Sequence, residues 1–341
     1  MEKVLNLCEK LRNNCSLSKE EYQFILEHTD ESTREQVATM ARDITVQKFG
    51  RNIYGRALIE LTSFCRNDCY YCGLRRSNDK AERYRLTQEQ VLDSAAAGYA
   101  QGYRTFVIQG GEDGYFTDQR LVPIVRHLRT QYPDVAITLS IGERSYESYA
   151  ALKEAGANRY LLRQETITEN HYNRLHPQEL QLENRIRCLR DLKALGYQVG
   201  TGIMVGSPYQ TNENIADDFV FFQEFRPHMI GIGPFLPHKD TPFHDREKGS
   251  LEKTLLILSL LRLMDESLLL PSTTALATLH PQGRELGILA GANVIMPNVS
   301  PSQVRKKYML YDNKVSTGEG QLEKSLDAIG YKIVVARGDH F

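Results

Sequence analysis

The stretch Ala57-Leu-Ile-Glu-Leu-Thr-Ser-Phe-Cys65-Arg-Asn-Asp-Cys69-Tyr-Tyr-Cys72 joins an apolar run of strand length to three closely spaced cysteines. A short apolar run of this kind is typical of a buried strand. The cysteines follow it directly, in the spacing C-x3-C-x2-C. Because α/β proteins place their chemistry at the carboxyl ends of parallel strands, this position indicates a functional cluster of thiols.

On both sides of this stretch the pattern divides into strands and helices. Strands are predicted at residues 56–62, 104–109, 135–140, 158–163, 198–204, 228–233, 271–275 and 292–296. Helices are predicted at 87–101, 118–131, 146–155, 181–195, 212–225, 251–265 and 282–290. Eight alternating strands favour a (β/α)8 TIM-type barrel. A doubly wound open sheet is the alternative, but the chain has no Gly-x-Gly-x-x-Gly turn to support it.

The alternating pattern also predicts how the chain is divided. Residues 1–50 form an N-terminal helical extension, 51–297 the barrel, and 298–341 a C-terminal extension packing on the barrel, over its mouth or its base. Residues 1–10 are charged and show no apolar leader, and charged residues interrupt the apolar run 255–270. That run predicts a buried helix, no membrane association is expected, and a cytoplasmic location is expected.

Composition excludes some classes of partner. The chain has 341 residues, of which 41% are hydrophobic and 25% charged, as in an ordinary globular protein with a large core. The formal net charge is −1, so no general attraction to nucleic acid or to anionic lipid is expected.

The six cysteines are of two kinds. Cys8, Cys15 and Cys188 are scattered singly and are predicted to be small buried apolar residues. The clustered thiolates are soft ligands, suited to an iron–sulfur cluster or to zinc. Structural zinc takes four protein ligands, and no nearby Cys or His completes such a set. Three thiolates on a four-iron cluster leave one iron open for a reactant, whereas an incomplete zinc knuckle or three buried thiols remain the alternatives.

Polar residues follow later strands in the same way. Gly110-Gly111-Glu112 ends the second strand, where glycines permit close backbone approach and the carboxylate can accept hydrogen bonds from a cationic amine. Arg163 and Glu165 leave the fourth strand and suit a zwitterionic ligand, although a salt bridge at the rim is the alternative. Arg185, at the start of the next helix, can bind a carboxylate bidentately or remain exposed to solvent.

The seventh predicted strand carries two neighbouring hydroxyl groups, on Thr273 and Thr274. Hydroxyls that project from a strand into a barrel suit the recognition of a small anion. The β-propensity of threonine alone is the alternative explanation.

The C-x3-C-x2-C motif, followed after the next strand by Gly-Gly-Glu, resembles the radical S-adenosylmethionine (SAM) superfamily. The resemblance implies that the open iron binds the amino and carboxylate groups of SAM. One electron from the cluster then cleaves SAM to a 5′-deoxyadenosyl radical. Tyr71 would lie near the adenine, and Met204 belongs to a segment, residues 200–206, that resembles the adenine-contacting segment of the superfamily.

Longer strings narrow the resemblance to the HydE family of FeFe-hydrogenase maturases. They are Cys-Gly-Leu-Arg-Arg (72–76), Tyr-Leu-Leu-Arg-Gln-Glu-Thr (160–166), Gly-Ile-Gly-Pro-Phe-Leu-Pro-His-Lys-Asp-Thr-Pro (231–242) and Ala-Asn-Val-Ile-Met-Pro-Asn (292–298), within a resemblance spanning about residues 45–312. The family implies an enzyme acting on a cysteine-bound iron carbonyl/cyanide complex in assembly of the hydrogenase H-cluster. It also implies partner maturases and an electron donor such as ferredoxin or flavodoxin.

The resemblance assigns roles to individual residues. It implies one 4Fe–4S cluster on Cys65, Cys69 and Cys72. The residues expected to contact SAM are Tyr71, Gln109, Gly111, Glu112, Glu165, Arg185 and Met204. Those expected to contact the substrate are Arg56, Arg163, Thr273, Thr274, Tyr308 and Tyr311.

The chain departs from the HydE pattern at two points. Gly110 stands where these proteins often have Ser, and no cysteine follows Cys188, so a second cluster on C-terminal cysteines cannot form. A methylornithine-synthase-like radical mutase, or a HydE paralogue with another small-molecule substrate, is therefore an alternative. A non-catalytic iron–sulfur electron carrier or sensor is a further alternative, although an open iron and the Gly-Gly-Glu segment argue against it.

Overall fold

The computed structural model describes residues 1–315 and 320–340; residues 316–319 and 341, which belong to the predicted C-terminal extension, lie outside the described residues. The helices are α1 (Glu2–Asn14), α2 (Lys19–His28), α3 (Glu31–Phe49), α4 (Gln88–Ala100), α5 (Asp118–Gln131), α6 (Tyr146–Glu154), α7 (Glu169–Leu175), α8 (Leu182–Ala194), α9 (Asn212–Phe225), α10 (Leu251–Met264), α11 (Thr274–Leu279), α12 (Gly283–Leu289), α13 (Ser302–Arg305) and α14 (Gln321–Ala328). The strands are β1 (Asn52–Gly55), β2 (Ala57–Thr62), β3 (Thr105–Gly110), β4 (Ala136–Ser140), β5 (Arg159–Leu161), β6 (Gln198–Thr201), β7 (Met204–Val205), β8 (Met229–Ile230), β9 (Gly233–Pro234), β10 (Val294–Ile295) and β11 (Lys332–Val334).

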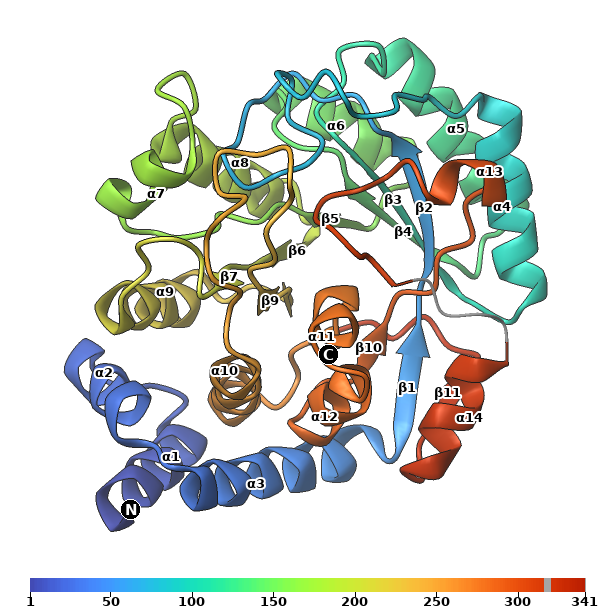
Figure 1. Ribbon diagram of the computed structural model, residues 1–341. Coiled ribbons are helices and arrows are strands. Elements are labelled where there is room, and N and C mark those ends of the chain that lie inside the picture. Colours follow the sequence, from blue (N-terminus) through green and yellow to red (C-terminus); the bar gives the residue numbers. More distant parts are fainter. Residues whose placement is uncertain (316–319, 341) are drawn as a thin grey trace.

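The strands form a closed parallel barrel with helices around it (Figure 1). Six of them are neighbours in the order β2-β3-β4-β5-β6-β8. Parallel bridges from Met229 to Leu269, from Pro271 to Val294 and from Leu58 to Asn298 complete the ring back to β2. The predicted (β/α)8 barrel is therefore confirmed, and the open sheet is wrong.

The predicted helices of the barrel match observed helices, but the seventh strand is misplaced. Residues 271–275 were expected to be extended, whereas the strand position is taken by Leu269 and Pro271, and α11 begins at Thr274 with Thr273 as its N-cap. Alanine and leucine, which dominate α11, have high helix propensity, and threonine is favoured at N-caps. The β-propensity of two threonines misled the prediction; α7, α11 and β11 were not predicted either.

The N-terminal helices α1–α3 pack against the outer helices of the barrel, α9, α10 and α12 (Figure 1). Tyr22 of α2 stacks on Phe219 of α9, with ring centroids 4.5 Å apart. Cys8 and Cys188 are buried, as expected. The expectation for Cys15 is wrong, because it lies exposed at the end of α1, in the left-handed conformation that turns the chain.

The C-terminal residues close the amino-terminal end of the barrel. β11 pairs in parallel with β1, and the chain then enters the base. There the fully buried guanidinium of Arg159 pairs with Asp339 at 2.7 Å and donates to the carbonyl of Arg337 at 3.0 Å. The hydroxyl of Thr105 donates to the same carbonyl at 2.8 Å. Because Thr105 and Arg159 are the first residues of β3 and β5, the tail seals the end of the barrel opposite the predicted site.

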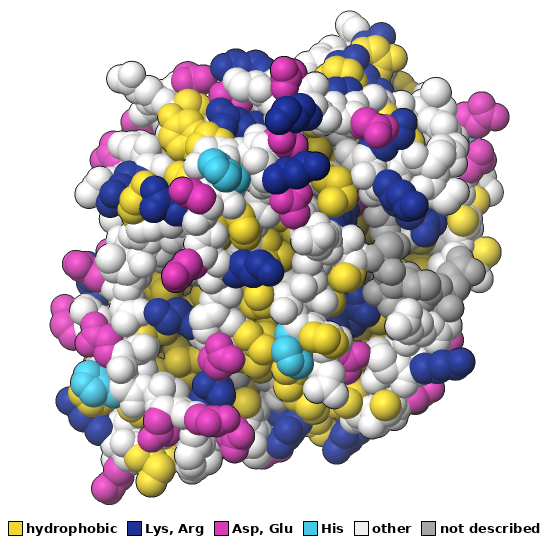
Figure 2. All heavy atoms as spheres, in the orientation of Figure 1, with side chains coloured by type: hydrophobic (Ala, Val, Ile, Leu, Met, Phe, Trp, Pro, Cys, Tyr) yellow, Lys and Arg dark blue, Asp and Glu magenta, His cyan; other side chains and the backbone are white. Residues whose placement is uncertain are grey.

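The surface is mixed in charge. Figure 2 shows basic and acidic side chains interspersed over the face in view, with apolar side chains between them. Among the helices in the described ranges, none is long and apolar enough to cross a membrane.

Candidate functional site

The loop that carries the three cysteines, residues 63–86, follows β2 and is held by buried polar contacts. The guanidinium of Arg83 donates to the backbone carbonyls of Leu74 at 2.9 Å, Arg75 at 2.7 Å and Asn78 at 3.0 Å, and also to that of Ser63. A network of this kind fixes a loop that has no regular structure of its own. Sequence reasoning missed Arg83, which follows Arg75 and Arg76 after the last cysteine.

The cysteine side chains lie partly buried at the barrel mouth, and those of Cys69 and Cys72 pack against the main core. Burial raises the pKa of the Cys72 thiol to about 12 and, together with the neighbouring Cys72 and Cys65, raises that of Cys69. Uncomplexed thiols here carry their protons, but a coordinating metal deprotonates a thiol outright.

The number of ligands bears on the choice between zinc and an iron–sulfur cluster. Among residues 1–315 and 320–340, no group of three or more His, Cys, Asp or Glu side chains is arranged so that it could hold a single metal ion. Cysteines that bind different irons of one cluster do not converge on one ion. A structural zinc site takes four protein ligands, whereas three thiolates on a four-iron cluster leave one iron open.

Two glycines bring the end of β3 against the cysteine loop. A Cβ on Gly111 would lie 2.3 Å from the carbonyl oxygen of Phe64 and 2.7 Å from the Cβ of Cys65. A Cβ on Gly142, at φ +83°, would lie 1.9 Å from the Cγ of Glu112. Only glycine fits at either position, and the result is that Glu112 lies beside Cys65.

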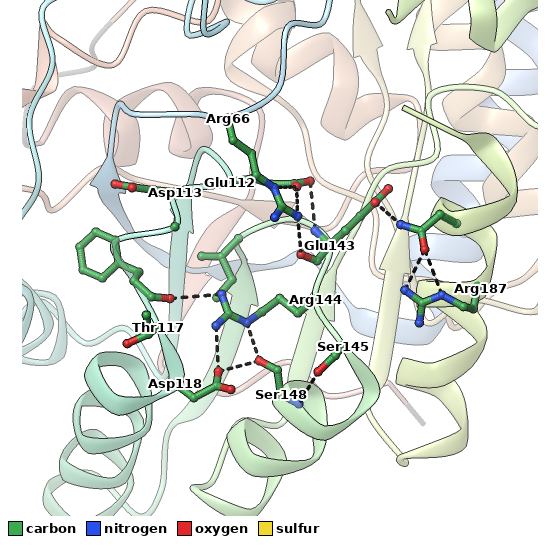
Figure 3. Close-up of a pocket in the computed structure, with 14 residues that line it drawn as sticks. Arg66, Glu112, Asp113, Thr117, Asp118, Glu143, Arg144, Ser145, Ser148 and Arg187 are labelled. Atoms are coloured by element: carbon green, nitrogen blue, oxygen red, sulfur yellow. Dashed lines mark hydrogen bonds and ion pairs between the residues drawn. The ribbon is translucent and has the colours of Figure 1, made fainter. Parts of the chain in front are cut away.

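The carboxylate of Glu112 is the centre of an ion-pair network (Figure 3). It is 8% exposed; its Oε2 accepts from Arg66 at 3.1 and 3.2 Å, and its Oε1 accepts from the backbone N–H of Glu143 at 3.0 Å. Arg185 lies 3.7 Å from the same Oε1 and 2.8 Å from a carboxylate oxygen of Glu143. Sequence reasoning missed Arg66 and Glu143, although Glu143 stands just after a strand end.

Arg66, Glu112 and Glu143 of this network also line a pocket of about 550 Å³. Figure 3 shows Arg66, Glu112 and Glu143 close together in its lining, while Arg144 pairs with Asp118 at 2.8 Å in another part of the lining. None of the cysteines lines it. The pocket therefore borders the predicted site without containing it.

The other end of the rim is apolar and aromatic. Met204 packs with Leu175, Phe235 and Phe243 in one buried group, and Tyr70 and Tyr71 lie against it. The structure thus brings together the two residues, Tyr71 and Met204, that were expected to lie near an adenine. Such a group offers flat apolar surface to a heteroaromatic ring.

Glu165 stands between the two ends, in the left-handed conformation at φ +66°. Its carboxylate accepts from the Arg163 guanidinium at 3.0 Å, and its backbone N–H donates to the carbonyl of Gly202 at 3.0 Å. Burial raises the pKa of Glu165, and Arg163 and Arg185 oppose that rise. A strained backbone held in place by neighbouring strands is common at binding sites.

Several buried polar atoms of the predicted site have no hydrogen-bond partner in the part of the chain that the structure describes. They are Nε and Nη2 of Arg56, Nε of Arg163 and Oγ1 of Thr273. Buried polar groups are seldom left unpaired, so unpaired donors inside a barrel indicate a ligand. The donor set fits anionic and zwitterionic groups.

The predicted substrate residues do not all lie together. The hydroxyl of Tyr308 accepts from Gln109 at 3.3 Å, and burial raises the pKa of Tyr311 to about 12. Thr274 opens α11 at the mouth, whereas the guanidinium of Arg56, a residue 5% exposed, donates to the sulfur of Met229 and lies towards the base, near Arg159.

Sequence reasoning also missed a buried ion pair at the mouth. Lys314 pairs with the fully buried carboxylate of Glu60, and its ammonium donates to the carbonyl of Tyr308 at 3.1 Å. Glu60 also accepts from Asn298 at 2.7 Å. Because Glu60 lies in β2 and Lys314 comes from the C-terminal segment, no local pattern signals the pair.

Comparison with known proteins agrees with this geometry. The profile of the Radical SAM superfamily matches residues 59–222. The chain is 41% identical to the FeFe hydrogenase maturase subunit HydE of Thermotoga maritima, over 92% of this chain and 89% of that protein. It is 26% identical to 3-methylornithine synthase of Methanosarcina acetivorans, over 84% and 81%.

Solved structures share the fold along almost the whole chain. The crystal structure of methylornithine synthase (PylB) has a TM-score of 0.84 at 25% identity, covering 96% of this chain and 97% of that one. That of HydG, a maturase of the FeFe-hydrogenase, has a TM-score of 0.82 at 20% identity, covering 97% and 76%.

Radical SAM enzymes use a 4Fe–4S cluster and SAM, and the thiols, the glycine cradle and the unpaired donors described above suit both groups. Because the match to HydE is long and its identity is high, it narrows the assignment from the superfamily to one family within it. The chain therefore belongs to the radical SAM enzymes and, among them, to the family of the FeFe-hydrogenase maturase HydE.

Proposed function

We propose that this chain acts on a cysteine-bound iron carbonyl/cyanide complex during assembly of the FeFe-hydrogenase H-cluster. Cys65, Cys69 and Cys72 hold its cluster, and SAM lies along the rim between Glu112 and Met204. The observation that carries the proposal is the placement of Glu112 and Arg185 beside the cysteine loop. The 41% identity to a hydrogenase maturase subunit supports the substrate class.

When bound, the reduced cluster and SAM supply a 5′-deoxyadenosyl radical. Glu112 accepts the ammonium of SAM, and Arg185, which Glu143 holds in place at 2.8 Å, donates to the carboxylate. Gln109 and Gly111 line the β3 side of the same end, and Glu165 completes the polar wall. Tyr71 and Met204 enclose the adenine with the apolar group around Leu175 and so exclude water.

The substrate is held by donors that lack partners in the described structure. Cyanide and carboxylate groups are acceptors, and Arg163 and Thr273 offer free buried donors at the mouth. Thr274, Tyr308 and Tyr311 complete the mouth of the cavity. Arg56 offers two more donors deeper in the barrel.

Two groups of proteins are proposed as partners. A second maturase supplies the iron complex, and a small electron-transfer protein, a ferredoxin or flavodoxin, reduces the cluster. Reduction of the cluster takes an electron from outside the chain, and such a protein would supply it.

Complementation tests the proposal most directly. The chain is expressed in a hydrogenase-maturation strain that lacks its HydE, and hydrogenase activity is the readout. Restored activity is expected, with Cys69→Ala as the inactive control. In parallel, anaerobically reconstituted protein should form 5′-deoxyadenosine from SAM when reduced.

A second candidate is a methylornithine-synthase-like mutase, which the 26% identity and the TM-score of 0.84 favour. It requires partners for a free amino group and a carboxylate along an alkyl chain. SAM cleavage without complementation would favour this candidate. An intact cluster without any 5′-deoxyadenosine would contradict both enzymes.

A further inference from the structure

Helix α7, which the sequence did not predict, contacts the cysteine loop at its C-terminal end. The backbone N–H of Tyr70 donates to the carbonyl of Leu175 at 3.0 Å. Tyr172 and His176, one turn apart, stack with ring centroids 4.0 Å apart. The helix therefore places an imidazole directly beside the loop that holds the cluster.

The imidazole of His176 is 2% exposed and is fixed at both nitrogens. Its Nδ1 lies 2.9 Å from the carbonyl oxygen of Tyr172, which can only accept, so Nδ1 carries the proton. Burial lowers the pKa of His176 to about 3, which keeps the ring neutral. Its Nε2 is then an acceptor.

The Tyr71 hydroxyl lies 3.1 Å from this Nε2, and the two rings meet edge to face with centroids 5.4 Å apart. A hydroxyl has one proton to donate. Cys69, the middle cysteine of the motif, is two positions away, and its interaction with the Tyr71 hydroxyl lowers the pKa of the thiol against the larger rise that burial causes. His176 and Cys69 therefore compete for a single donor.

We propose that His176 is a positioning residue for Tyr71: its Nε2 accepts the hydroxyl proton, orients the ring at the wall of the SAM site and keeps that proton from the Cys69 sulfur. The inference rests on the proposed function, since it needs a cluster on Cys69 and SAM beside Tyr71. Hydrogen bonds to ligating sulfurs tune cluster potentials. A donated proton stabilises the more negative reduced state and so raises the potential.

The experiment uses the full chain, anaerobically reconstituted with its cluster. His176→Phe keeps a ring on Tyr172 but offers no acceptor, which frees the Tyr71 hydroxyl for Cys69. The reduction potential, from an EPR-monitored titration, should become more positive. SAM should bind between about twofold and tenfold more weakly, the range of one net hydrogen bond.

Matched variants separate this role from a structural one. His176→Gln retains an acceptor and should stay near the wild-type potential. The double variant Tyr71→Phe/His176→Phe has no hydroxyl to donate to Cys69, so its reduction potential should return to the wild-type value. His171→Phe alters another buried histidine of α7, bonded to the Pro208 carbonyl at 3.2 Å, and should change stability without changing the potential.

Three results would overturn the inference. They are a wild-type potential and SAM affinity in His176→Phe, a shifted potential that persists in the double variant, and an equal shift in His171→Phe. If His176→Phe loses iron, Tyr71→Phe serves in its place, because it removes the same hydrogen bond. Wild-type SAM affinity in Tyr71→Phe would then overturn the inference. If the cluster of the wild-type protein shows no spectroscopic response to SAM, the proposed function itself is contradicted. That outcome is distinct from the three results above.

Discussion

Gly142 keeps Glu112 in position by having no side chain, so the substitution Gly142→Ala tests the polar end of the site. The added Cβ would lie 1.9 Å from the Cγ of Glu112 and 2.3 Å from its Cδ. At these distances something must shift, and the flexible Glu112 side chain gives way more easily than the backbone, so the carboxylate leaves its place beside Arg185. The ammonium of SAM then loses its acceptor.

Two separate costs follow from the structure. The left-handed backbone at φ +83° costs alanine about 1–2 kcal/mol of folding stability. A hydrogen bond to a charged group contributes about 1.5–3 kcal/mol, so SAM affinity should fall roughly tenfold to hundredfold. The first cost is seen in thermal unfolding and the second in a SAM titration of the cluster EPR signal.

Gly196→Ala is the matched control, because Gly196 has φ +75° and no atom within 4 Å of an added Cβ. It should lose similar stability but keep wild-type SAM affinity. Wild-type SAM affinity in Gly142→Ala would refute the assignment of Glu112 as the ammonium acceptor. Equal loss of affinity in both variants would show that backbone strain, and not the carboxylate, is responsible.

Three further predictions concern the cluster, the cavity and the loop. Cys69→Ala should abolish both the cluster, measured as iron per chain, and SAM cleavage, and a variant that still cleaves SAM would contradict the ligand set. Thr273→Ala should leave 5′-deoxyadenosine formation intact but lose the product, because its buried hydroxyl has no partner among the described residues; unchanged product would exclude it from the cavity. The Arg75 guanidinium holds the pKa of Asp68 well below its usual value of about 4, so this stabilisation is present above that pH and is lost as the pH falls below it. In Asp68→Asn the free energy of unfolding should therefore fall less steeply as the pH is lowered. An unchanged pH dependence would contradict the pairing of Asp68 with Arg75.

Much of the fold was predictable because its signals are local. Apolar runs separated by amphipathic helical stretches repeat along residues 56–296, and seven predicted helices agree with the structure to within one residue at each end. The seventh strand failed because two threonines resemble a strand when read alone. The strand position is taken by Leu269 and Pro271 instead, and Thr273 is the N-cap of a helix rich in alanine and leucine.

The site was predictable only in part. Residues with a fixed spacing, such as the cysteines and the glycines before Glu112, could be found in the sequence. Glu143 and His176 could not, because each acts on a segment that approaches it only in the folded chain.

The sequence by itself determined that three thiols follow the first barrel strand and that a carboxylate ends the next one, because the spacing of ligands is a local property. Only the tertiary structure decided which charges meet. Arg159 pairs with Asp339 across 180 positions to seal the base, and Lys314 reaches Glu60 across 254 positions at the mouth. Contacts between segments so far apart depend on how the barrel closes, and barrel closure leaves no pattern within either segment.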